Sequence, residues 1–321
     1  MRAVVLPQAR GVVEVRDVDL GVPGPGEVLV RMEACGVCHS DLFICGLEKL
    51  PRAPVTLGHE GIGRVEAVGE GITGWAVGDR AGTTFLGATC GGCEWCTGGR
   101  ERFCPKQTNF GYTADGAMAE YLVAPVNTLV HVPADLNATE IAPLCCAGWT
   151  AAGAVREAKL APGQLLALFG YGGLGQLALQ IALSRGFRVA VSDVSPEKME
   201  AARASGAEPV AKGSADAAIV FTAAAAAIPQ AFRAVKRTGT LILVGLSTTQ
   251  YELPLVDTVL RGITVRGSYL GTRDDLDEVF QLALRGVVRP SVEVHPLSEG
   301  PVMLDRLRRG EVSGRAVIAF W

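Results

Sequence analysis

The chain has 321 residues, of which 49% are hydrophobic and 20% are charged, and its formal net charge is −3. This composition is ordinary for a globular protein and excludes a disordered chain, while the length accommodates two domains. The near-neutral charge, without massed Lys or Arg, argues against nucleic acid or an anionic membrane as a partner.

The N-terminal sequence MRAVVLPQAR lacks the apolar core and cleavage site of a secretory signal. The longest nearly continuous apolar run, residues 217–228, is too short to span a bilayer. Nine cysteines without an export signal suit a reducing compartment better than an oxidising one. These features predict a cytoplasmic protein.

Short β-type runs separated by Gly and Pro fill the first half of the chain, at 28–33, 63–68 and 121–124. Such runs predict an antiparallel, loop-rich domain. From about residue 149 the pattern changes, and predicted strands alternate with predicted helices. The strands are 165–169, 187–193, 218–221, 240–244 and 264–267, and the helices between the first of them are 174–184 and 196–205.

Alternation of strands and helices predicts a parallel sheet with crossover helices. The tail contains a helix-like segment, 303–309, and a strand-like segment, 316–320, and we expect it to return to the first domain. The predicted fold is therefore α/β, with a β-rich domain formed by 1–148 and 272–321 and a doubly wound domain formed by 149–271.

Four cysteines, Cys90, Cys93, Cys96 and Cys104, have the spacing C-x2-C-x2-C-x7-C. Four thiolates at such spacing can hold one tetrahedral Zn²⁺ and leave it no open position, which is typical of a structural site. An iron–sulfur site is the alternative, since C-x2-C-x2-C also opens ferredoxin motifs. Those motifs have three residues before the last cysteine, whereas this chain has seven, so the spacing favours zinc.

A glycine-rich turn follows the predicted strand 165–169 and opens the next helix, with the sequence Gly170-Tyr171-Gly172-Gly173-Leu174-Gly175. In that position the G-x-G-x-x-G pattern predicts a dinucleotide site with the pyrophosphate at the helix N-terminus. Asp193 ends the next strand, where a carboxylate can bind the adenosine ribose hydroxyls and repel a 2′-phosphate. Asp193 therefore predicts NAD rather than NADP, although capping of the following helix is a simpler role for it.

Further residues with metal-ligand chemistry occur at Cys38-His39-Ser40-Asp41, at Gly58-His59-Glu60 and at Cys146. Two thiolates and one imidazole leave a fourth position of zinc open, as a catalytic zinc requires. Each residue alone has a structural explanation, because buried Cys and hydrogen-bonded His are common. The combination with a dinucleotide motif favours catalysis.

With these motifs the chain resembles the zinc-dependent alcohol dehydrogenases of the medium-chain dehydrogenase/reductase superfamily, along essentially its whole length. The motifs that carry the resemblance are GVCHSD at 36–41, GHE at 58–60, VGDR at 77–80, the four cysteines, CAG at 146–148, the glycine turn and SGR at 313–315. The resemblance implies a GroES-like catalytic domain interrupted by a Rossmann domain, with the active site in the cleft between them. It implies two zinc ions per chain, one catalytic and one structural, with NAD as the cofactor.

The resemblance also implies roles for individual residues. Cys38, His59 and Cys146 match the catalytic zinc ligands, with Cys145 as the neighbouring competitor for the third position. Glu60 matches a carboxylate that can approach the metal, Asp41 the residue that orients the ligand histidine, Ser40 the hydroxyl that bonds the substrate oxygen and starts a proton relay, and Phe85 a wall of the alcohol pocket. The expected cofactor contacts are His39, Thr150, Gly170, Gly172, Gly173, Leu174, Gly175, Asp193, Lys198, Gly245, Leu246 and Arg315.

The chain departs from the family pattern at two places. Many relatives have a relay histidine where this chain has Phe43, which cannot carry a proton. The stretch 211–218 is also shorter than usual, which predicts that a strand–helix excursion of the nucleotide domain is trimmed.

The predicted activity is interconversion of an alcohol and its aldehyde or ketone by hydride transfer to NAD. The alternatives are a related zinc enzyme acting on polyols, amino alcohols or aromatic alcohols and, more remotely, a non-catalytic NAD-binding protein or a zinc-free quinone reductase. Cys146 weighs against the polyol enzymes, which tend to have Glu there. The resemblance further implies a homodimer or homotetramer, while the particular alcohol does not follow from the sequence.

Overall fold

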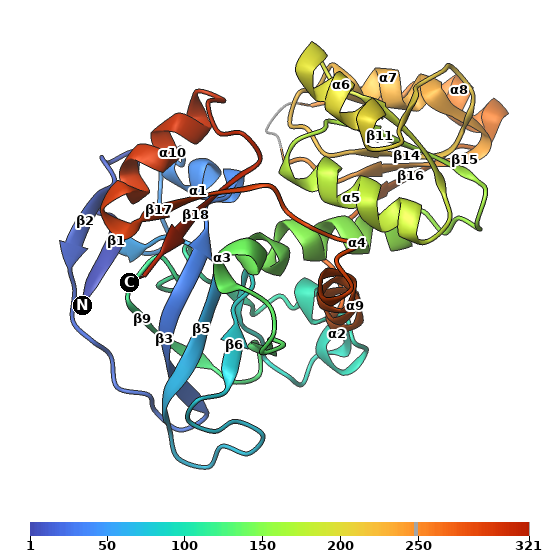
Figure 1. Cartoon of the computed structure of the whole chain (residues 1–321). Helices are drawn as coiled ribbons and strands as arrows, with labels where there is room; N and C mark the ends of the chain where they lie inside the picture. Colours follow the sequence, from blue (N-terminus) through green and yellow to red (C-terminus); the bar gives the residue numbers. More distant parts are fainter. Residues whose placement is uncertain (247–249, 321) are drawn as a thin grey trace. The chain divides into compact units, whose positions relative to one another are not determined.

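The computed structural model describes residues 1–246 and 250–320 (Figure 1). Contacts divide the chain into two units, one formed by Met1–Cys146 with the segment from Arg289 onward, and one formed by Ala147–Val288. The sequence predicted that the chain returns to the first unit at residue 272, whereas in the structure it returns at Arg289. Helix α9 (Arg273–Leu284) instead packs with α4 (Ala147–Glu157) in the second unit.

Two polar contacts explain this later boundary. Arg156 of α4 donates two hydrogen bonds to the buried carboxylate of Asp275, at 2.9 and 3.1 Å. The indole Nε1 of Trp149 donates to the backbone oxygen of Thr272 at 2.6 Å. Both contacts tie the beginning of α9 to α4, and the charge-assisted pair would leave a buried carboxylate unpaired if α9 moved away.

The first unit is built on a seven-stranded sheet that is antiparallel apart from the pair β17–β18. Its strand order is β10 (Val130–His131), β6 (Arg80–Gly82), β5 (Glu60–Val68), β3 (Glu27–Gly36), β18 (Arg315–Ala319) and β17 (Val292–Pro296), and β9 (Tyr121–Pro125) also pairs with β3. The smaller sheets are β2 (Glu14–Asp17), β1 (Arg2–Leu6) and β4 (Val55–Thr56), and β7 (Leu86–Ala88) with β8 (Thr108–Asn109). The α-helices of this unit are α1 (His39–Cys45), α2 (Glu94–Thr97), α3 (Ala138–Ile141) and α10 (Gly300–Arg308).

The core of the first unit explains why the tail returns to it. All five residues of β18 are buried, and β18 pairs antiparallel with β3 in the register Val317 to Gly36 and Ile318 to Cys35. A strand buried along its whole length is stabilised by about 25 cal/mol for each Å² of apolar surface removed from water. This pairing brings the end of the chain beside the segment that leads into Cys38.

The second unit contains a six-stranded sheet whose pairs are all parallel, as the sequence predicted. The order is β13 (Glu208–Pro209), β12 (Arg188–Ser192), β11 (Leu165–Phe169), β14 (Ala215–Val220), β15 (Val235–Leu243) and β16 (Thr264–Gly267). The helices that pack on it include α5 (Gly173–Ser184), α6 (Pro196–Ala204), α7 (Ala227–Ala234) and α8 (Leu255–Arg261). The strand order reverses between β11 and β14, and ligands of such sheets bind at the carboxyl ends of the strands beside this reversal.

The link between β13 and β14 is short. Residues 210–214 join the two strands without a helix, whereas β11 and β12 are joined through α5 and β14 and β15 through α7. The absence of a helix from this link is compatible with the trimmed excursion expected from the stretch 211–218, which stays a prediction.

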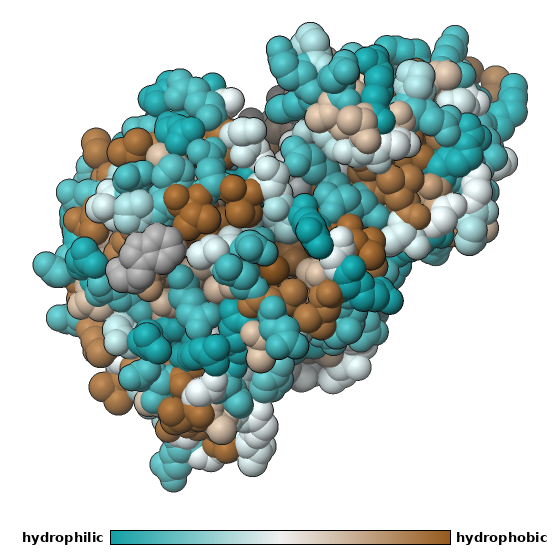
Figure 2. All heavy atoms as spheres, in the orientation of Figure 1, coloured by the Kyte–Doolittle hydropathy of each residue, from teal (hydrophilic) through white to brown (hydrophobic). Residues whose placement is uncertain are grey.

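Hydrophobic and hydrophilic residues are interspersed on the face drawn in Figure 2, without one continuous apolar band. Among the described residues, none of the helices has both the length and the apolar character needed to cross a membrane. Helix α8 is unusual in that four of its apolar side chains are about 70% exposed, namely Leu255, Val256, Val259 and Leu260. Such a cluster is larger than the isolated exposed apolar residues that are normal on protein surfaces.

Candidate functional site

Four buried side chains from distant parts of the first unit converge. Cys38, His59, Glu60 and Cys146, here called the mixed cluster, place one ligand atom each within 4.8 Å of all the others. Cys38 caps the N-terminus of α1, His59 and Glu60 stand at the beginning of β5, and Cys146 directly follows the 3-10 helix Ala142–Cys145. The three residues proposed as catalytic ligands from the sequence therefore lie together.

Local geometry at the start of α1 fixes Cys38 and Asp41. The carboxylate of Asp41 accepts a hydrogen bond from the backbone N–H of Cys38 at 2.9 Å, which completes a capping box. The sulfur of Cys38 accepts from the backbone N–H of Ser40 at 3.5 Å. The other carboxylate oxygen of Asp41 lies 3.4 Å from Nδ1 of His59, so Asp41 faces the imidazole that it is predicted to orient.

The imidazole of His59 carries the strongest sign that the cluster binds a metal. Both ring nitrogens are buried and, within 1–246 and 250–320, neither has a hydrogen-bond partner. A buried polar atom without a partner costs about 1–3 kcal/mol. Coordination removes that cost, and two thiols with one imidazole are the nitrogen and sulfur donors that zinc prefers. The residues present therefore fit a zinc ion.

The two thiols of the mixed cluster are not equivalent in the metal-free chain. A hydrogen bond with Cys146, supported by His59, holds the pKa of Cys38 well below its ordinary value although burial opposes this. The same hydrogen bond and burial raise the pKa of Cys146. The lowered pKa favours the thiolate of Cys38, and the thiolate is the form in which cysteine binds metals.

Glu60 is paired with a cation from the end of the chain. Nη2 of Arg315 donates to both carboxylate oxygens of Glu60, and it also donates to the backbone oxygen of Val37 at 3.2 Å. Burial nevertheless raises the pKa of Glu60 to about 8 against the opposing charge of Arg315. Gly36 lies directly opposite, and a Cβ there would come within 1.9 Å of the carboxylate. Arg315 thus has a buried partner here, and its pyrophosphate contact stays a prediction.

Three other residues named from the sequence, Ser40, Phe85 and Phe43, differ in how they lie relative to the mixed cluster. The hydroxyl of Ser40 lies 3.6 Å from the sulfur of Cys38. The ring of Phe85 stands edge-on to that of His59, with centroids 5.1 Å apart, as a pocket wall beside the metal site would require. Phe43 is 44% exposed on α1, and its hydrocarbon ring cannot accept a proton.

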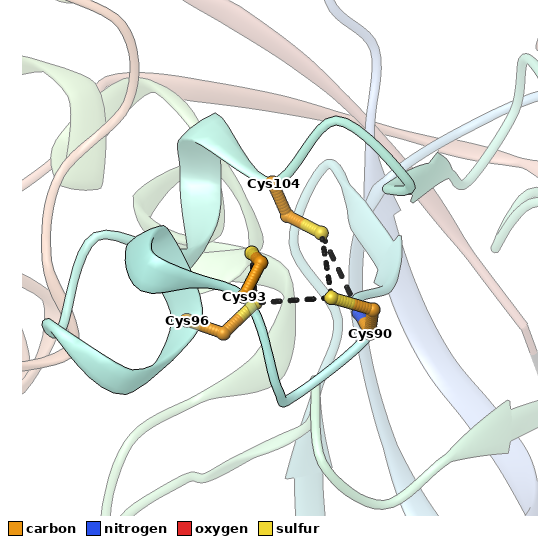
Figure 3. Close-up of side chains that lie close together, drawn as sticks. All are labelled: Cys90, Cys93, Cys96 and Cys104. Atoms are coloured by element: carbon orange, nitrogen blue, oxygen red, sulfur yellow. Dashed lines mark hydrogen bonds between the residues drawn. The ribbon is translucent and has the colours of Figure 1, made fainter.

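The four-cysteine lobe, formed by Cys90, Cys93, Cys96 and Cys104, is compact and lies at the surface. Figure 3 shows the four sulfurs directed toward one another, and they lie within 4.8 Å of each other. Cys93 and Cys96 are 3.5 Å apart at sulfur, as are Cys90 and Cys104. Backbone N–H groups of Gly92 and Cys93 hold the pKa of Cys90 at about 6. Four sulfurs in this arrangement match a closed tetrahedral site.

The glycine turn of the second unit has the backbone that the motif requires. Gly170 has a φ of +99°, which side-chain-bearing residues rarely adopt, and α5 begins at Gly173. A Cβ on Gly175 would lie 2.1 Å from the backbone oxygen of Gly170, so only glycine permits this close packing. Asp193 accepts hydrogen bonds from the backbone N–H groups of Tyr171 at 2.7 Å and Ser195 at 3.0 Å, which places its carboxylate beside the turn.

The remaining predicted cofactor residues are spread over both units. Thr150 is buried in α4, Lys198 is exposed on α6, and Leu246 is 62% exposed just after β15. Gly245 lies so close to Thr222 that a Cβ would come within 2.4 Å of its backbone oxygen. His39 begins α1 in the first unit. Their contacts with a cofactor stay predictions.

Comparison with known protein families finds a match in each of the two units. Residues 24–134 match the family model of the alcohol dehydrogenase GroES-like domain, and residues 173–285 match that of zinc-binding dehydrogenases. An alcohol dehydrogenase of Geobacillus stearothermophilus is 40% identical, with 99% of this chain and 98% of the relative covered.

Solved structures give the same result. The alcohol dehydrogenase of the archaeon Aeropyrum pernix has a TM-score of 0.92 at 32% identity, with both chains covered completely. An NAD-dependent alcohol dehydrogenase has a TM-score of 0.89 at 29% identity, again with complete coverage of both chains. The chain therefore belongs to the zinc-dependent alcohol dehydrogenases of the medium-chain dehydrogenase/reductase superfamily.

Proposed function

We propose that this protein oxidises an alcohol to its aldehyde or ketone, and catalyses the reverse reaction, with zinc in the mixed cluster and NAD as the hydride acceptor. The observation that carries this proposal is the buried imidazole of His59, whose nitrogens make no hydrogen bond within 1–246 and 250–320 and whose Nδ1 faces Asp41 at 3.4 Å. The imidazole lies within 4.8 Å of the two thiols and the carboxylate. The two thiols and the imidazole can hold a metal and leave a fourth position open for substrate, because Glu60 is paired with Arg315.

The ligands would be Cys38, His59 and Cys146. Zinc bound there would supply Lewis acidity, which lowers the pKa of an oxygen such as that of water from about 15.7 to about 7. Asp41 faces Nδ1 of the imidazole and so favours the tautomer that leaves Nε2 available as a ligand. Glu60 adds a carboxylate beside these ligands, and the ion pair with Arg315 balances its charge.

Ser40 is the residue placed to take the hydroxyl proton of the alcohol. Its hydroxyl can accept one hydrogen bond while donating another, and it lies 3.6 Å from the sulfur of Cys38. Phe43 stands where a relay histidine is common among relatives, and its ring has no proton-accepting atom. The proton must therefore leave Ser40 by another route, and Phe85 beside His59 supplies an apolar wall that limits access of water.

NAD is the proposed cofactor because of the carboxylate of Asp193. Its oxygens are fixed by two backbone N–H groups next to the glycine turn, where they can bind ribose hydroxyls and repel a 2′-phosphate. The similarity to an NAD-dependent alcohol dehydrogenase supports the same choice.

We also propose that the protein acts as a cytoplasmic homo-oligomer, dimeric or tetrameric. The exposed apolar side chains of α8 and the position of β16 at the edge of its sheet support association, since both would be partly covered by a second copy. The substrate alternatives remain polyols, amino alcohols and aromatic alcohols.

The proposal is tested with the purified full chain. Metal analysis should find two zinc ions per chain, and a panel of primary, secondary, aromatic and polyhydric alcohols should produce NADH faster than NADPH. Cys38→Ser should lose turnover by at least about 10³-fold, because the Lewis acid contributes several kcal/mol to transition-state stabilisation. Cys45→Ser is the matched control, since Cys45 is buried in the same unit outside the mixed cluster.

Reduction of neither cofactor by any alcohol of the panel would contradict the activity. Clear preference for NADP would contradict the role of Asp193. Equal loss of activity in Cys38→Ser and Cys45→Ser would contradict the assignment of the ligands, because it would trace the loss to general damage of the core.

A further inference from the structure

The hydroxyl of Thr83 bridges the backbone on both sides of Glu60. Its Oγ1 accepts a hydrogen bond from the N–H of Gly61 at 2.9 Å and donates one to the carbonyl oxygen of His59 at 3.3 Å. The backbone N–H of Thr83 also donates to the carbonyl of Gly61 at 2.8 Å. Thr83 is completely buried, so these contacts are shielded from water.

The position of Thr83 explains why a side chain is needed there. The ladder between β5 and β6 runs from Arg64 and Arg80 to Ile62 and Gly82, where it stops. Beyond that point the backbone of β6 no longer supplies partners for both the N–H of Gly61 and the carbonyl of His59. The hydroxyl supplies both, because a hydroxyl can accept and donate at the same time.

The chain around the hydroxyl is shaped to admit it. A Cβ on Gly61 would lie 2.7 Å from Oγ1 of Thr83 and 2.6 Å from Cβ of Ala117. Only glycine at position 61 therefore leaves room for the hydroxyl of Thr83. On the opposite side of β5, Glu60 pairs with Gly36 of β3, so the strand end that carries Glu60 is held from both sides.

We propose that Thr83 is a positioning residue for the metal site: its hydroxyl fixes the main chain at His59 and Glu60 and thereby sets the imidazole and carboxylate relative to Cys38 and Cys146. The inference rests on the proposed zinc binding of the mixed cluster. Residues that orient metal ligands typically change metal affinity or activity by about 10–100-fold when they are replaced. Thr83 acts here through the main chain, without touching a ligand atom.

The test compares zinc release from folded variants in the presence of a metallochromic chelator. Thr83→Val keeps the shape of the side chain and removes the hydroxyl, whereas Thr83→Ser keeps the hydroxyl. The Cys38→Ser variant identifies the phase that comes from the mixed cluster, since it retains only the ion of the four-cysteine lobe. We expect this phase to be about 10–100-fold faster in Thr83→Val and close to wild type in Thr83→Ser.

Thr128→Val is the matched control. Thr128 is also a buried threonine of the first unit, and its hydroxyl donates to the carbonyls of Gly87 and Pro125, each at 3.1 Å. Its loss should lower thermal stability and leave release from the mixed cluster unchanged. An absorption spectrum of the cobalt(II)-substituted protein gives a second readout, which should shift in Thr83→Val and not in Thr128→Val.

Equal release from Thr83→Val and wild type, or equal acceleration in Thr83→Val and Thr128→Val, would overturn the proposal. Thr83→Ala is made in parallel, and failure of both hydroxyl-free variants to fold would overturn it too, because the hydroxyl would then serve the fold and not the site. If the wild-type protein binds two zinc ions and oxidises no alcohol, the proposed activity fails while the release comparison still decides the role of Thr83.

Discussion

The mixed cluster and the four-cysteine lobe are two candidate zinc sites in one unit, and they are built in opposite ways. The lobe takes all four ligands from residues 90–104, and Cys90 among them is exposed. The mixed cluster draws on residues 38 to 146, and all four of its side chains are buried. The lobe offers sulfur alone, whereas the mixed cluster combines sulfur, nitrogen and oxygen.

This contrast matches the difference between structural and catalytic zinc sites. A short loop with four sulfurs can close around its ion with little help from the rest of the fold, and it leaves no position for substrate. The mixed cluster depends on α1, β5 and the segment before α4 all being in place. Its composition suits an open metal position, and Ser40 and Phe85, the proposed proton acceptor and pocket wall, lie beside it.

The largest expected effect comes from two adjacent cysteines. Cys146 belongs to the mixed cluster, while Cys145 is also buried and lies outside it. Cys146→Ser should lose one zinc ion and at least about 10³-fold in kcat/KM, because a ligand of the Lewis acid is removed. Cys145→Ser should keep two ions and most of the activity. Metal analysis and steady-state kinetics check both, and the reverse result would move the third ligand to Cys145.

Loss of the lobe should have a smaller effect, and a different one. Cys104 is fully buried, and its sulfur accepts from the backbone N–H of Cys90 at 3.5 Å. Cys104→Ser should bind one zinc ion and keep kcat at 25 °C within about threefold, since the lobe has no open position for substrate. Calorimetry should find a lower Tm, because a loss of about 2 kcal/mol corresponds to about 4–8 °C in a unit of this size.

The outcome that would break the comparison is a large fall in kcat for Cys104→Ser with Tm unchanged. The lobe would then contribute to turnover directly. Cys45→Ser again serves as the control, and it should keep both ions and nearly the wild-type Tm.

The smallest expected effect concerns the reactivity of the thiols after zinc is removed. Backbone hydrogen bonds hold the pKa of Cys90 at about 6, whereas burial and a hydrogen bond with Cys93 raise that of Cys96 to about 11. Because the thiolate is the reactive form, alkylation of Cys90 by iodoacetamide should increase as pH rises through about 6 and reach its plateau by neutrality. Cys96 should react slowly until well above pH 9, as read by mass spectrometry of the alkylated peptides.

Cys38 serves as a buried comparison for Cys90 in this alkylation experiment. Its pKa is also lowered, with a hydrogen bond from Cys146 as the main cause, and yet only 5% of its surface is exposed. It should therefore stay unmodified at pH values where Cys90 is fully alkylated. Similar rates for Cys38 and Cys90 would mean that the mixed cluster is open to solvent in the metal-free protein.

The accuracy of the predicted strands varies within each unit, and in the second unit the prediction of 240–244 missed the first five residues of β15, Val235–Gly239. The predicted strand 165–169 agrees with β11 without a change of boundary, because its continuous apolar run is a strong signal for a buried strand. The predicted strand 264–267 agrees with β16. In the first unit the prediction of 63–68 missed the first three residues of β5, Glu60–Ile62. Gly61 and Gly63 interrupt the β-type pattern there, although the missed residues carry one member of the mixed cluster.

Thr83 shows a second limit of the sequence. It lies in the run Thr83-Thr84-Phe85, where nothing distinguishes one hydroxyl from the other. Only the end of the β5–β6 ladder shows which of them meets Gly61 and His59. The sequence also did not show that the guanidinium of Arg315 pairs with Glu60, and its predicted cofactor contact stays a prediction.

Taken alone, the sequence determined the features whose parts are neighbours along the chain. These are the four-cysteine lobe, the glycine turn with Asp193 after the next strand, and the alternation of strands and helices in the second unit, all set by spacing and local conformational preference. The tertiary structure decided which distant groups meet. It brought Cys38 close to His59 and Cys146, paired Glu60 with Arg315, and placed α9 in the second unit. Such contacts depend on sheet register and on burial of whole strands, which are properties of the packed chain and of no single segment.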